Sequence, residues 1–196
     1  CSAEDVRRAM EAWEGVAYHK PLNTGPFEAE FFDAGHILGS SFLRIKAEGK
    51  TIIFSGDLGN SPAPIINPTE LLPETDYCVI ESTYGDREHE SPDARREELE
   101  DAIEDAVKAG GVLMIPAFAM ERTQDLLFHI HELLEEGRVP RVPIFIDSPL
   151  AIKLTAVYKK YESYFNKQTS AHIVKTADDI LNFPELRLTL TVEQSK

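Results

Sequence analysis

Residues 31–59, FFDAGHILGSSFLRIKAEGKTIIFSGDLG, decide the first half of the fold. Apolar and β-branched residues predict strands at residues 27–34, 42–47 and 51–55. Residues 48–50, Glu-Gly-Lys, predict a turn, so the last two strands should form a hairpin. This half of the chain is therefore expected to be rich in β-structure.

Two polar side chains follow these strands, each flanked by glycines. His36 lies in DAGHILGS, residues 33–40, and Asp57 lies in FSGDLG, residues 54–59. Small neighbours let a metal ion or a substrate approach closely, and a carboxylate can bridge two divalent ions. Adjacent strands could bring both residues to one edge of a sheet. The other interpretations are a structural histidine and an ordinary turn aspartate. A metal site needs at least three protein ligands, so any site here is incomplete.

The second half of the chain has a different pattern of apolar residues. Residues 60–73 carry four prolines and two asparagines, which predicts a linker between the halves. From residue 77 onward, apolar strands alternate with amphipathic helices, which implies a parallel sheet with helices on its faces. The predicted strands are residues 77–80, 112–115 (a buried strand) and 143–146, and the predicted helices are residues 92–109, 121–136 and 149–165.

Ligands of open α/β sheets bind outside the carboxyl ends of the strands. Those ends are ESTY at residues 81–84, PAF at residues 116–118 and DSP at residues 147–149. The sequence therefore predicts that a ligand-binding site involves these three segments.

Five ordered motifs resemble those of a known family. AGHILGS (34–40) and SGDLG (55–59) resemble metal-ligand motifs of the metallo-β-lactamase fold, and ESTYG (81–85), PAFAMERTQ (116–124) and DSPLA (147–151) resemble its β-CASP branch, which processes nucleic acids. The resemblance implies an α/β fold. Residues 1–75 would form the second half of one side of an αββα sandwich. Residues 76–196 would form a β-CASP domain, incomplete at its C-terminal end, with a mostly parallel sheet flanked by helices.

The same resemblance implies a catalytic site. His36 would bind one metal ion and Asp57 would bridge two, with zinc as the expected metal. The ions would activate a water for attack on a phosphodiester bond. Glu81 would join Asp57 in catalysis by orienting a histidine that supports protonation of the leaving oxygen. The alternative for Glu81 is a carboxylate that caps nearby backbone amides.

Four residues are expected to contact the substrate. Arg122 suits a phosphate because its guanidinium is planar, although it could instead pair with acids on its helix. Ser148 could hold a phosphate with its hydroxyl and nearby amides, or only cap its helix. Ser82 and Tyr84 belong to the ESTYG motif and complete the set.

The implied function is a metal-dependent RNA-processing nuclease that cuts single-stranded RNA, as an endonuclease or as a 5′-to-3′ exonuclease. The alternatives are a non-catalytic β-CASP scaffold in an RNA-processing complex and a relative that acts on DNA. A doubly wound nucleotide-binding module is disfavoured, because no G-x-G-x-x-G or Walker loop follows any strand.

Some motifs of the family are missing. HxHxDH, which supplies most ligands of the first metal ion, would precede Cys1, and further histidines and the closing strands would follow Lys196. We therefore expect an internal piece of a longer protein, inactive by itself and without stably bound zinc. An unpaired sheet edge in residues 1–75 favours self-association or disorder. The longer protein could form a homodimer.

The composition of the chain limits the partners and the cellular location that are expected. The 196 residues are 42% hydrophobic and 28% charged, and no apolar run approaches the ~18 residues that span a bilayer, so no membrane partner is expected. Two cysteines make no disulfide framework, which favours the cytoplasm. The net charge of −14 weighs against a polyanionic partner, but half of it lies in residues 86–105, the pattern of a solvated helix face. Arg87 and His89 in this segment either touch substrate or belong to a mobile acidic loop.

Overall fold

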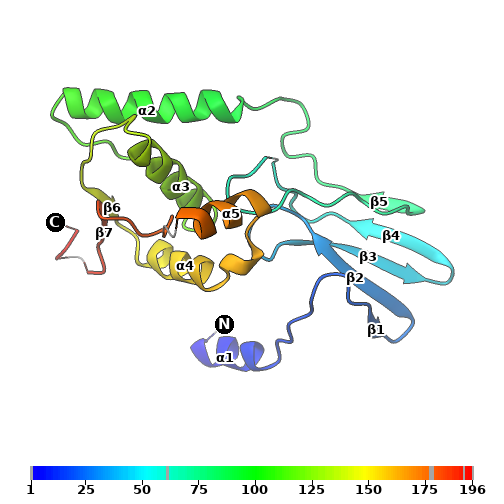
Figure 1. The fold of residues 1–196 in the computed structure, drawn as a ribbon. Coiled ribbons are helices and arrows are strands. Elements are labelled where there is room, and N and C mark those ends of the chain that lie inside the picture. Colours follow the sequence, from blue (N-terminus) through cyan, green and yellow to red (C-terminus); the bar gives the residue numbers. More distant parts are fainter. Residues whose placement is uncertain (1, 61, 177–178, 192, 196) are drawn as a thin grey trace.

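The computed structural model describes residues 2–60, 62–176, 179–191 and 193–195. A five-stranded sheet occupies one side and most of the helices the other (Figure 1). The helices are α1 (Ala3–Glu11), α2 (Pro92–Lys108), α3 (Arg122–Glu135), α4 (Pro149–Lys160), the 3-10 helix η1 (Glu162–Tyr164) and α5 (Lys167–Thr176). The strands are β1 (Leu22–Thr24), β2 (Phe27–Asp33), β3 (Ser41–Ala47), β4 (Lys50–Phe54), β5 (Tyr77–Val79), β6 (Ile144–Ile146) and β7 (Leu186–Leu188).

The larger sheet contains β1 to β5 in chain order. The first four strands pair antiparallel, and β5 runs parallel to β4. The predicted hairpin is confirmed, with Ala47 opposite Lys50. Its two turn residues, Glu48 and Gly49, have φ of 52° and 75°, the positive values that a tight hairpin turn requires. The strands that precede His36 and Asp57 are therefore neighbours of β3, one on each side.

A small apolar cluster stabilises this sheet. It consists of Phe32, Phe42 and Ile53 from β2, β3 and β4. The two phenylalanine rings are stacked, with their centroids 5.0 Å apart. Arg44 covers the Phe32 ring and pairs with Glu30 across the β2–β3 ladder. The cluster is too small to be the main core of the molecule.

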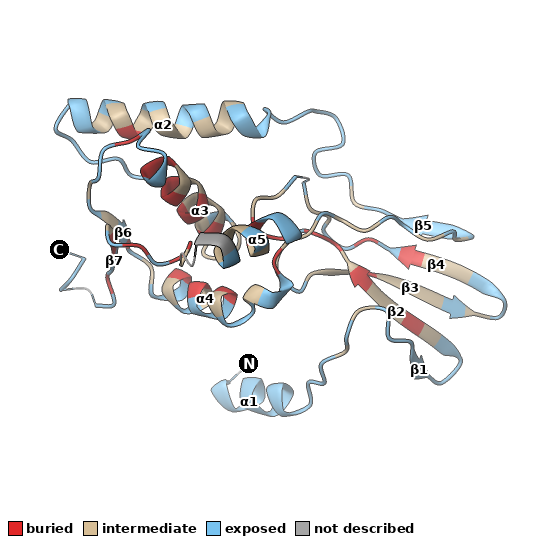
Figure 2. Cartoon of the chain, viewed as in Figure 1, coloured by how far each residue is buried: buried red, intermediate tan, exposed pale blue. Residues whose placement is uncertain are grey.

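The main core lies among α3, α4 and the segments around them, as the buried residues in Figure 2 show. Leu127, Leu133 and Leu134 of α3 are at most 4% exposed. Burial of a leucine side chain contributes about 1.5–3 kcal/mol. These leucines lie on the apolar face of the amphipathic helix predicted at residues 121–136, and the helices carry most of the hydrophobic stabilisation.

Residues 60–73, expected as a linker, have neither helix nor strand among the described positions, but the middle of the segment is packed in place. Ile65 and Ile66 are 0% and 4% exposed and belong to the main core. The side-chain amide of Asn166 donates to the carbonyl oxygens of Pro64 and Ile66 at 3.0 and 3.2 Å. The connection thus ties the sheet to the helices.

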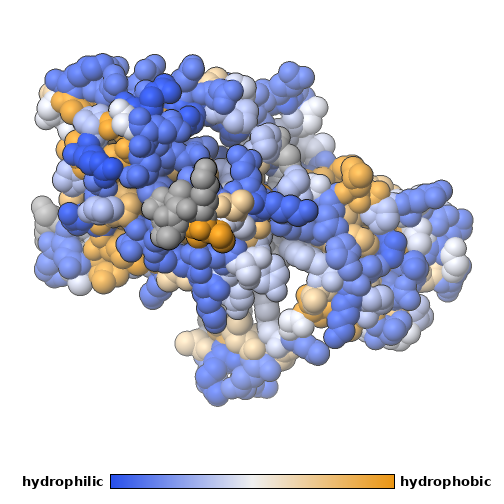
Figure 3. All heavy atoms as spheres, viewed as in Figure 1, coloured by the Kyte–Doolittle hydropathy of each residue, from blue (hydrophilic) through white to orange (hydrophobic). Residues whose placement is uncertain are grey.

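The prediction of a buried strand at residues 112–115 is wrong. The segment forms no strand, and Val112 and Met114 are 88% and 84% exposed. A strand needs a partner for its backbone hydrogen bonds, and no described strand pairs with this segment. Figure 3 shows apolar areas on an otherwise largely hydrophilic face. Local composition predicted an apolar segment correctly but could not specify a partner for it.

The fold is mixed α/β, while the sheet composition differs from the expectation. The larger sheet is mostly antiparallel, and the parallel sheet of the second half has only β6 and β7. Because β5 pairs with β4, the larger sheet extends beyond the predicted boundary between residues 75 and 76. The partial sandwich and the two domain ranges remain predictions. Among the described residues, no helix has the length and apolar character needed to cross a bilayer.

Candidate active site

Two glycines bring the loop of His36 against the loop of Asp57. The Gly59 N–H donates to the carbonyl oxygen of Ala34 at 2.9 Å. A Cβ at Gly59 would lie 1.5 Å from the carbonyl oxygen of Gly35, so no side chain fits there. The ends of β2 and β4 therefore meet at one edge of the sheet, as the glycine-flanked pattern predicts. Contrary to the expectation from the sequence, the two strands are not adjacent, because β3 lies between them.

Glu81, just beyond β5, is hydrogen-bonded to the loop that follows β4. Its N–H donates to the Ser55 hydroxyl at 2.9 Å, and its Oε1 accepts the Leu58 N–H at 2.7 Å. The hydrogen bond from Leu58, assisted by those from Thr83, lowers the pKa of Glu81 below its usual value. Glu81 is therefore an ionised carboxylate that fixes the residue next to Asp57. This is the capping role named as its alternative, and orientation of a histidine remains a prediction.

His36 and Asp57 are suitable types of metal ligand, but two ligands are too few for a metal site. His36 and Asp57 are both exposed on the converged loops, and imidazole and carboxylate groups are common zinc ligands. His36 also contributes electrostatically to the lowered pKa of Glu81. Within the part of the chain that the structure describes, no three His, Cys, Asp or Glu side chains are grouped to hold a metal ion. His36 and Asp57 can supply part of a zinc site but do not complete one.

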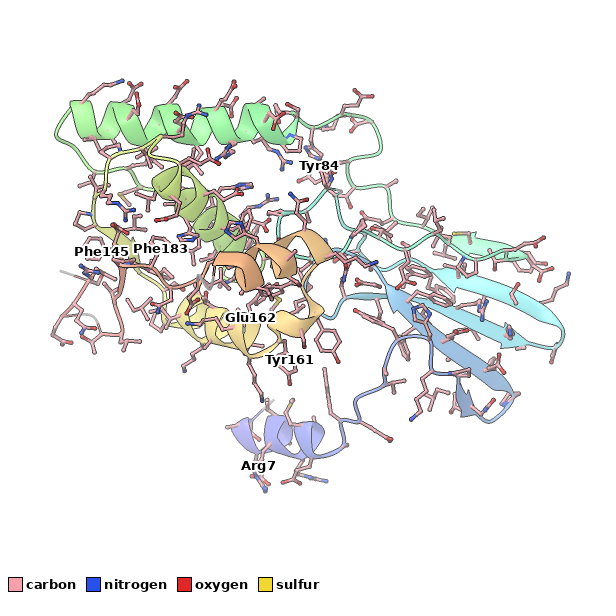
Figure 4. All side chains as sticks on the ribbon, viewed as in Figure 1. Arg7, Tyr84, Phe145, Tyr161, Glu162 and Phe183 are labelled. Carbon is pink, nitrogen blue, oxygen red and sulfur yellow. The ribbon has the colours of Figure 1, made fainter. Side chains whose placement is uncertain are left out.

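A cavity of about 510 Å³ opens beside Glu81. It lies between the loop after β4 and the segment that leads from β5 into α2. Two expected substrate contacts, Ser82 and Tyr84, line it together with Arg87, His89 and Arg95. Figure 4 shows Tyr84 near the amino-terminal end of α2. The site therefore combines carboxylate, aromatic and cationic groups on the walls of one cavity.

The helices reach the His36 loop through Tyr158 of α4. The Leu38 N–H donates to Tyr158 Oη at 3.3 Å, and Tyr158 donates in turn to the Glu121 carboxylate. Burial raises the pKa of Glu121, while the Tyr158 hydrogen bond opposes that rise. Glu121 has a φ of 61°, which is costly for a residue other than glycine. The network fixes the loop that carries His36 to α3 and α4.

Asp125 lies one turn into α3 from Glu121. Burial, reinforced by the negative charge of Glu121, raises the pKa of Asp125 to about 7. Its Oδ1 is buried and accepts no hydrogen bond from the described residues. Arg122 and Arg95 oppose the rise electrostatically. Asp125 is therefore a carboxylate in an unfavourable environment, and it interacts electrostatically with Arg95, which lines the cavity.

Comparisons with known proteins agree with these motifs. Residues 123–196 match the Beta-Casp domain. Ribonuclease TTHA0252 from Thermus thermophilus is 34% identical over 172 residues, 88% of this chain and 39% of the relative. An RNase J-like protein from Methanocaldococcus jannaschii is 32% identical over 194 residues, 92% of this chain and 46% of the relative. Cleavage and polyadenylation specificity factor subunit 3-I from Arabidopsis thaliana is 32% identical over 160 residues, 81% of this chain and 23% of the relative.

The chain belongs to the β-CASP family. It spans less than half the length of each of these three relatives.

The two remaining candidates of this β-CASP chain lie on the helices. Arg122 is exposed at the start of α3 and acts electrostatically on Glu121 and Asp125, in line with the alternative of a partner for helix acids. Ser148 caps α4, and its Oγ accepts the Ala151 N–H at 3.2 Å. It lies ten residues before Tyr158, roughly 15 Å along the helix at 1.5 Å per residue. Ser148 is therefore at the end of α4 away from the His36 loop.

Sequence reasoning missed Glu121 and Tyr158 as parts of this site. One signal was available for Tyr158, because Ala151, Thr155 and Tyr158 form a buried stripe on α4. A buried tyrosine hydroxyl usually has a hydrogen-bond partner. The sequence could not identify that partner, since Glu121 is 37 positions away.

Proposed function

We propose that this β-CASP chain supplies part of the active site of a metal-dependent nuclease that hydrolyses phosphodiester bonds in single-stranded RNA. The contact between Gly35 and Gly59 carries the proposal, because it packs the loop of His36 against the loop of Asp57. An ionised Glu81 is hydrogen-bonded to the same edge. Relatives named as ribonucleases support RNA as the substrate.

His36 and Asp57 would each offer a ligand to zinc, and the other ligands of a two-zinc site would come from sequence beyond these 196 residues. Bound zinc would supply an activated water and stabilise the negative charge that develops on the phosphate. Glu81 keeps the Asp57 loop in place through the Leu58 N–H. Its charge would also orient and stabilise a protonated histidine near the leaving oxygen.

The substrate would enter along the cavity beside Glu81. Ser82 and Tyr84 line this cavity, and Arg122 and Ser148 would contact phosphates farther along the RNA. Such contacts would hold the chain in register, because phosphate contacts position a nucleic acid without reading its sequence.

The test uses the full-length gene product, with zinc content and cleavage of labelled single-stranded RNA measured on the same samples. We expect about two zinc ions per protein molecule and RNA cleavage, with both reduced in His36→Ala and Asp57→Ala. His172→Ala, a histidine substitution on α5, serves as the matched control and should keep both properties. The 196-residue chain by itself should neither retain zinc nor cut RNA.

Other outcomes would decide between the alternatives. A full-length protein that holds no zinc and leaves RNA intact would be the non-catalytic scaffold. Faster cleavage of DNA than of RNA of the same sequence would identify a DNA-acting enzyme. A cytoplasmic location and a homodimeric assembly also remain predictions, which cell fractionation and light scattering of the full-length protein test.

A further inference from the structure

We propose that the cavity beside Glu81 binds one nucleotide unit of the RNA, with the base stacked on Tyr84 and a phosphate at Arg95. This inference rests on the proposed function, since it names what one part of that site would hold. It adds Arg95 to the residues considered from the sequence and separates a base-binding wall from a phosphate-binding wall.

The size of the cavity suits such a ligand. Its volume of about 510 Å³ lies within the range of roughly 300–1,000 Å³ that small-molecule sites occupy. Glu81 forms part of its wall and is tied to the loop of Asp57. A nucleotide in this cavity would therefore lie next to the position proposed for phosphodiester cleavage.

Tyr84 provides the surface for a base. Its ring packs against the edge of His89 with the centroids 5.0 Å apart, and the Arg87 guanidinium lies 5.9 Å from the ring centroid. Both contacts hold the ring in place, yet Tyr84 remains 59% exposed. Nucleobases stack on such rings in proteins that bind single strands, whatever the base.

Arg95 provides the donor for a phosphate. It lines the cavity from the first turn of α2, and its Nε is buried without an acceptor among the described residues. Asp125 interacts with it electrostatically but forms no ion pair with it within 4.0 Å. The Nε of Arg95 is enclosed by the protein, so the terminal Nη groups of Arg95 would donate to the phosphate. They form no hydrogen bond or ion pair with the described residues.

The acids on the same walls limit the ligand to a single nucleotide. Glu88 and Glu90 line the cavity together with Glu81, so its cations do not outnumber its carboxylates. A long phosphate backbone would meet as much repulsion as attraction here. One phosphate at Arg95, combined with stacking at Tyr84, fits the charge pattern better than a phosphate track.

The experiment measures binding to the 196-residue chain by calorimetry, with three probes: adenosine 5′-monophosphate, ribose 5-phosphate and adenosine. The nucleotide should bind more tightly than either partial probe. Tyr84→Ala should weaken the nucleotide and adenosine about tenfold, or about 1.4 kcal/mol, and leave ribose 5-phosphate unchanged. Arg95→Gln should weaken the nucleotide and ribose 5-phosphate but not adenosine.

Two matched variants control for nonspecific effects. Tyr77→Ala removes a tyrosine of similar exposure on β5 that does not line the cavity, and Arg8→Gln removes the same charge on α1. Neither should change the affinity for any probe. Tyr84→Phe keeps the ring and should keep nucleotide binding.

The proposal is overturned if the nucleotide binds no better than ribose 5-phosphate, or if Tyr84→Ala behaves like Tyr77→Ala. Nucleotide binding does not depend on cleavage, so the two ideas can fail separately. Binding that follows the predicted pattern, in a protein whose full-length form cuts no RNA, would uphold the cavity assignment and refute the nuclease. RNA cleavage by the full-length protein without this pattern of binding would uphold the nuclease and refute the cavity assignment.

Discussion

Replacing Asp125 by asparagine should stabilise the protein above neutral pH and remove part of its pH dependence. Asp125 is partly buried in α3, its Oδ1 is buried without a hydrogen-bond partner among the described residues, and its pKa is about 7 instead of 3.8. Between these values the unfolded chain loses the proton while the folded protein keeps it. The free energy of unfolding should therefore fall as pH rises from about 4 to about 7.

The difference between the folded and unfolded pKa of Asp125 sets how much unfolding free energy is lost. It is about 3 pH units, and each unit corresponds to about 1.36 kcal/mol, which gives about 4 kcal/mol as an upper limit. Asparagine has nearly the same shape and no charge, so Asp125→Asn should recover a large part of this energy at pH 8. At pH 4 the two proteins should differ little, because the wild-type carboxyl is protonated in the folded state there.

Urea unfolding of both proteins at several pH values between 4 and 8 measures the effect. Asp101→Asn makes the same chemical change on the exposed face of α2 and should leave the pH profile unaltered. The reasoning is refuted if wild type and Asp125→Asn lose stability equally between pH 4 and pH 7. It is also refuted if the variant is the less stable protein at pH 8.

Three further substitutions test the packing described above, each by denaturant unfolding. Gly59→Ala should lower the free energy of unfolding by at least about 1–3 kcal/mol, because the added Cβ overlaps the Gly35 carbonyl. In the control Gly15→Ala, the added Cβ meets no atom within 4 Å, so the substitution should be tolerated. Equal effects of the two substitutions would contradict the contact between the loops. Tyr158→Phe should cost about 1–3 kcal/mol by leaving the Glu121 carboxylate and the Leu38 N–H without their partner, and an unchanged midpoint would argue against this network. Val112→Lys should change stability by less than about 0.5 kcal/mol, since the side chain is 88% exposed. A loss of several kcal/mol would instead support the buried strand predicted from the sequence.

Local signals in the sequence predicted the starts of α2, α3 and α4 to within one residue, although the helix predicted to reach residue 165 ends at Lys160. The two Ser-Pro pairs mark helix starts, and α2 and α4 begin at Pro92 and Pro149. In each, the serine hydroxyl accepts an N–H from the first turn. Caps and hairpin turns depend on residues a few positions apart, which is why a single sequence reveals them.

Contacts between distant segments could not be predicted in the same way. The apolar segment at residues 112–115 has strand-like composition, but a strand also requires a partner, and composition does not name one. The Tyr158–Leu38 contact spans 120 positions. The meeting of the His36 and Asp57 loops was expected from their glycines, whereas the close fit of Gly59 against Gly35 depends on the fold of the whole sheet.

The most direct test of the account is the rate at which the full-length gene product and its Asp57→Asn variant cut a 5′-labelled single-stranded RNA. The variant keeps the size of an exposed side chain, so both proteins should unfold at the same denaturant midpoint. The account predicts cleavage by the wild type and loss of both cleavage and zinc in the variant. Equal cleavage by two equally folded proteins would contradict it.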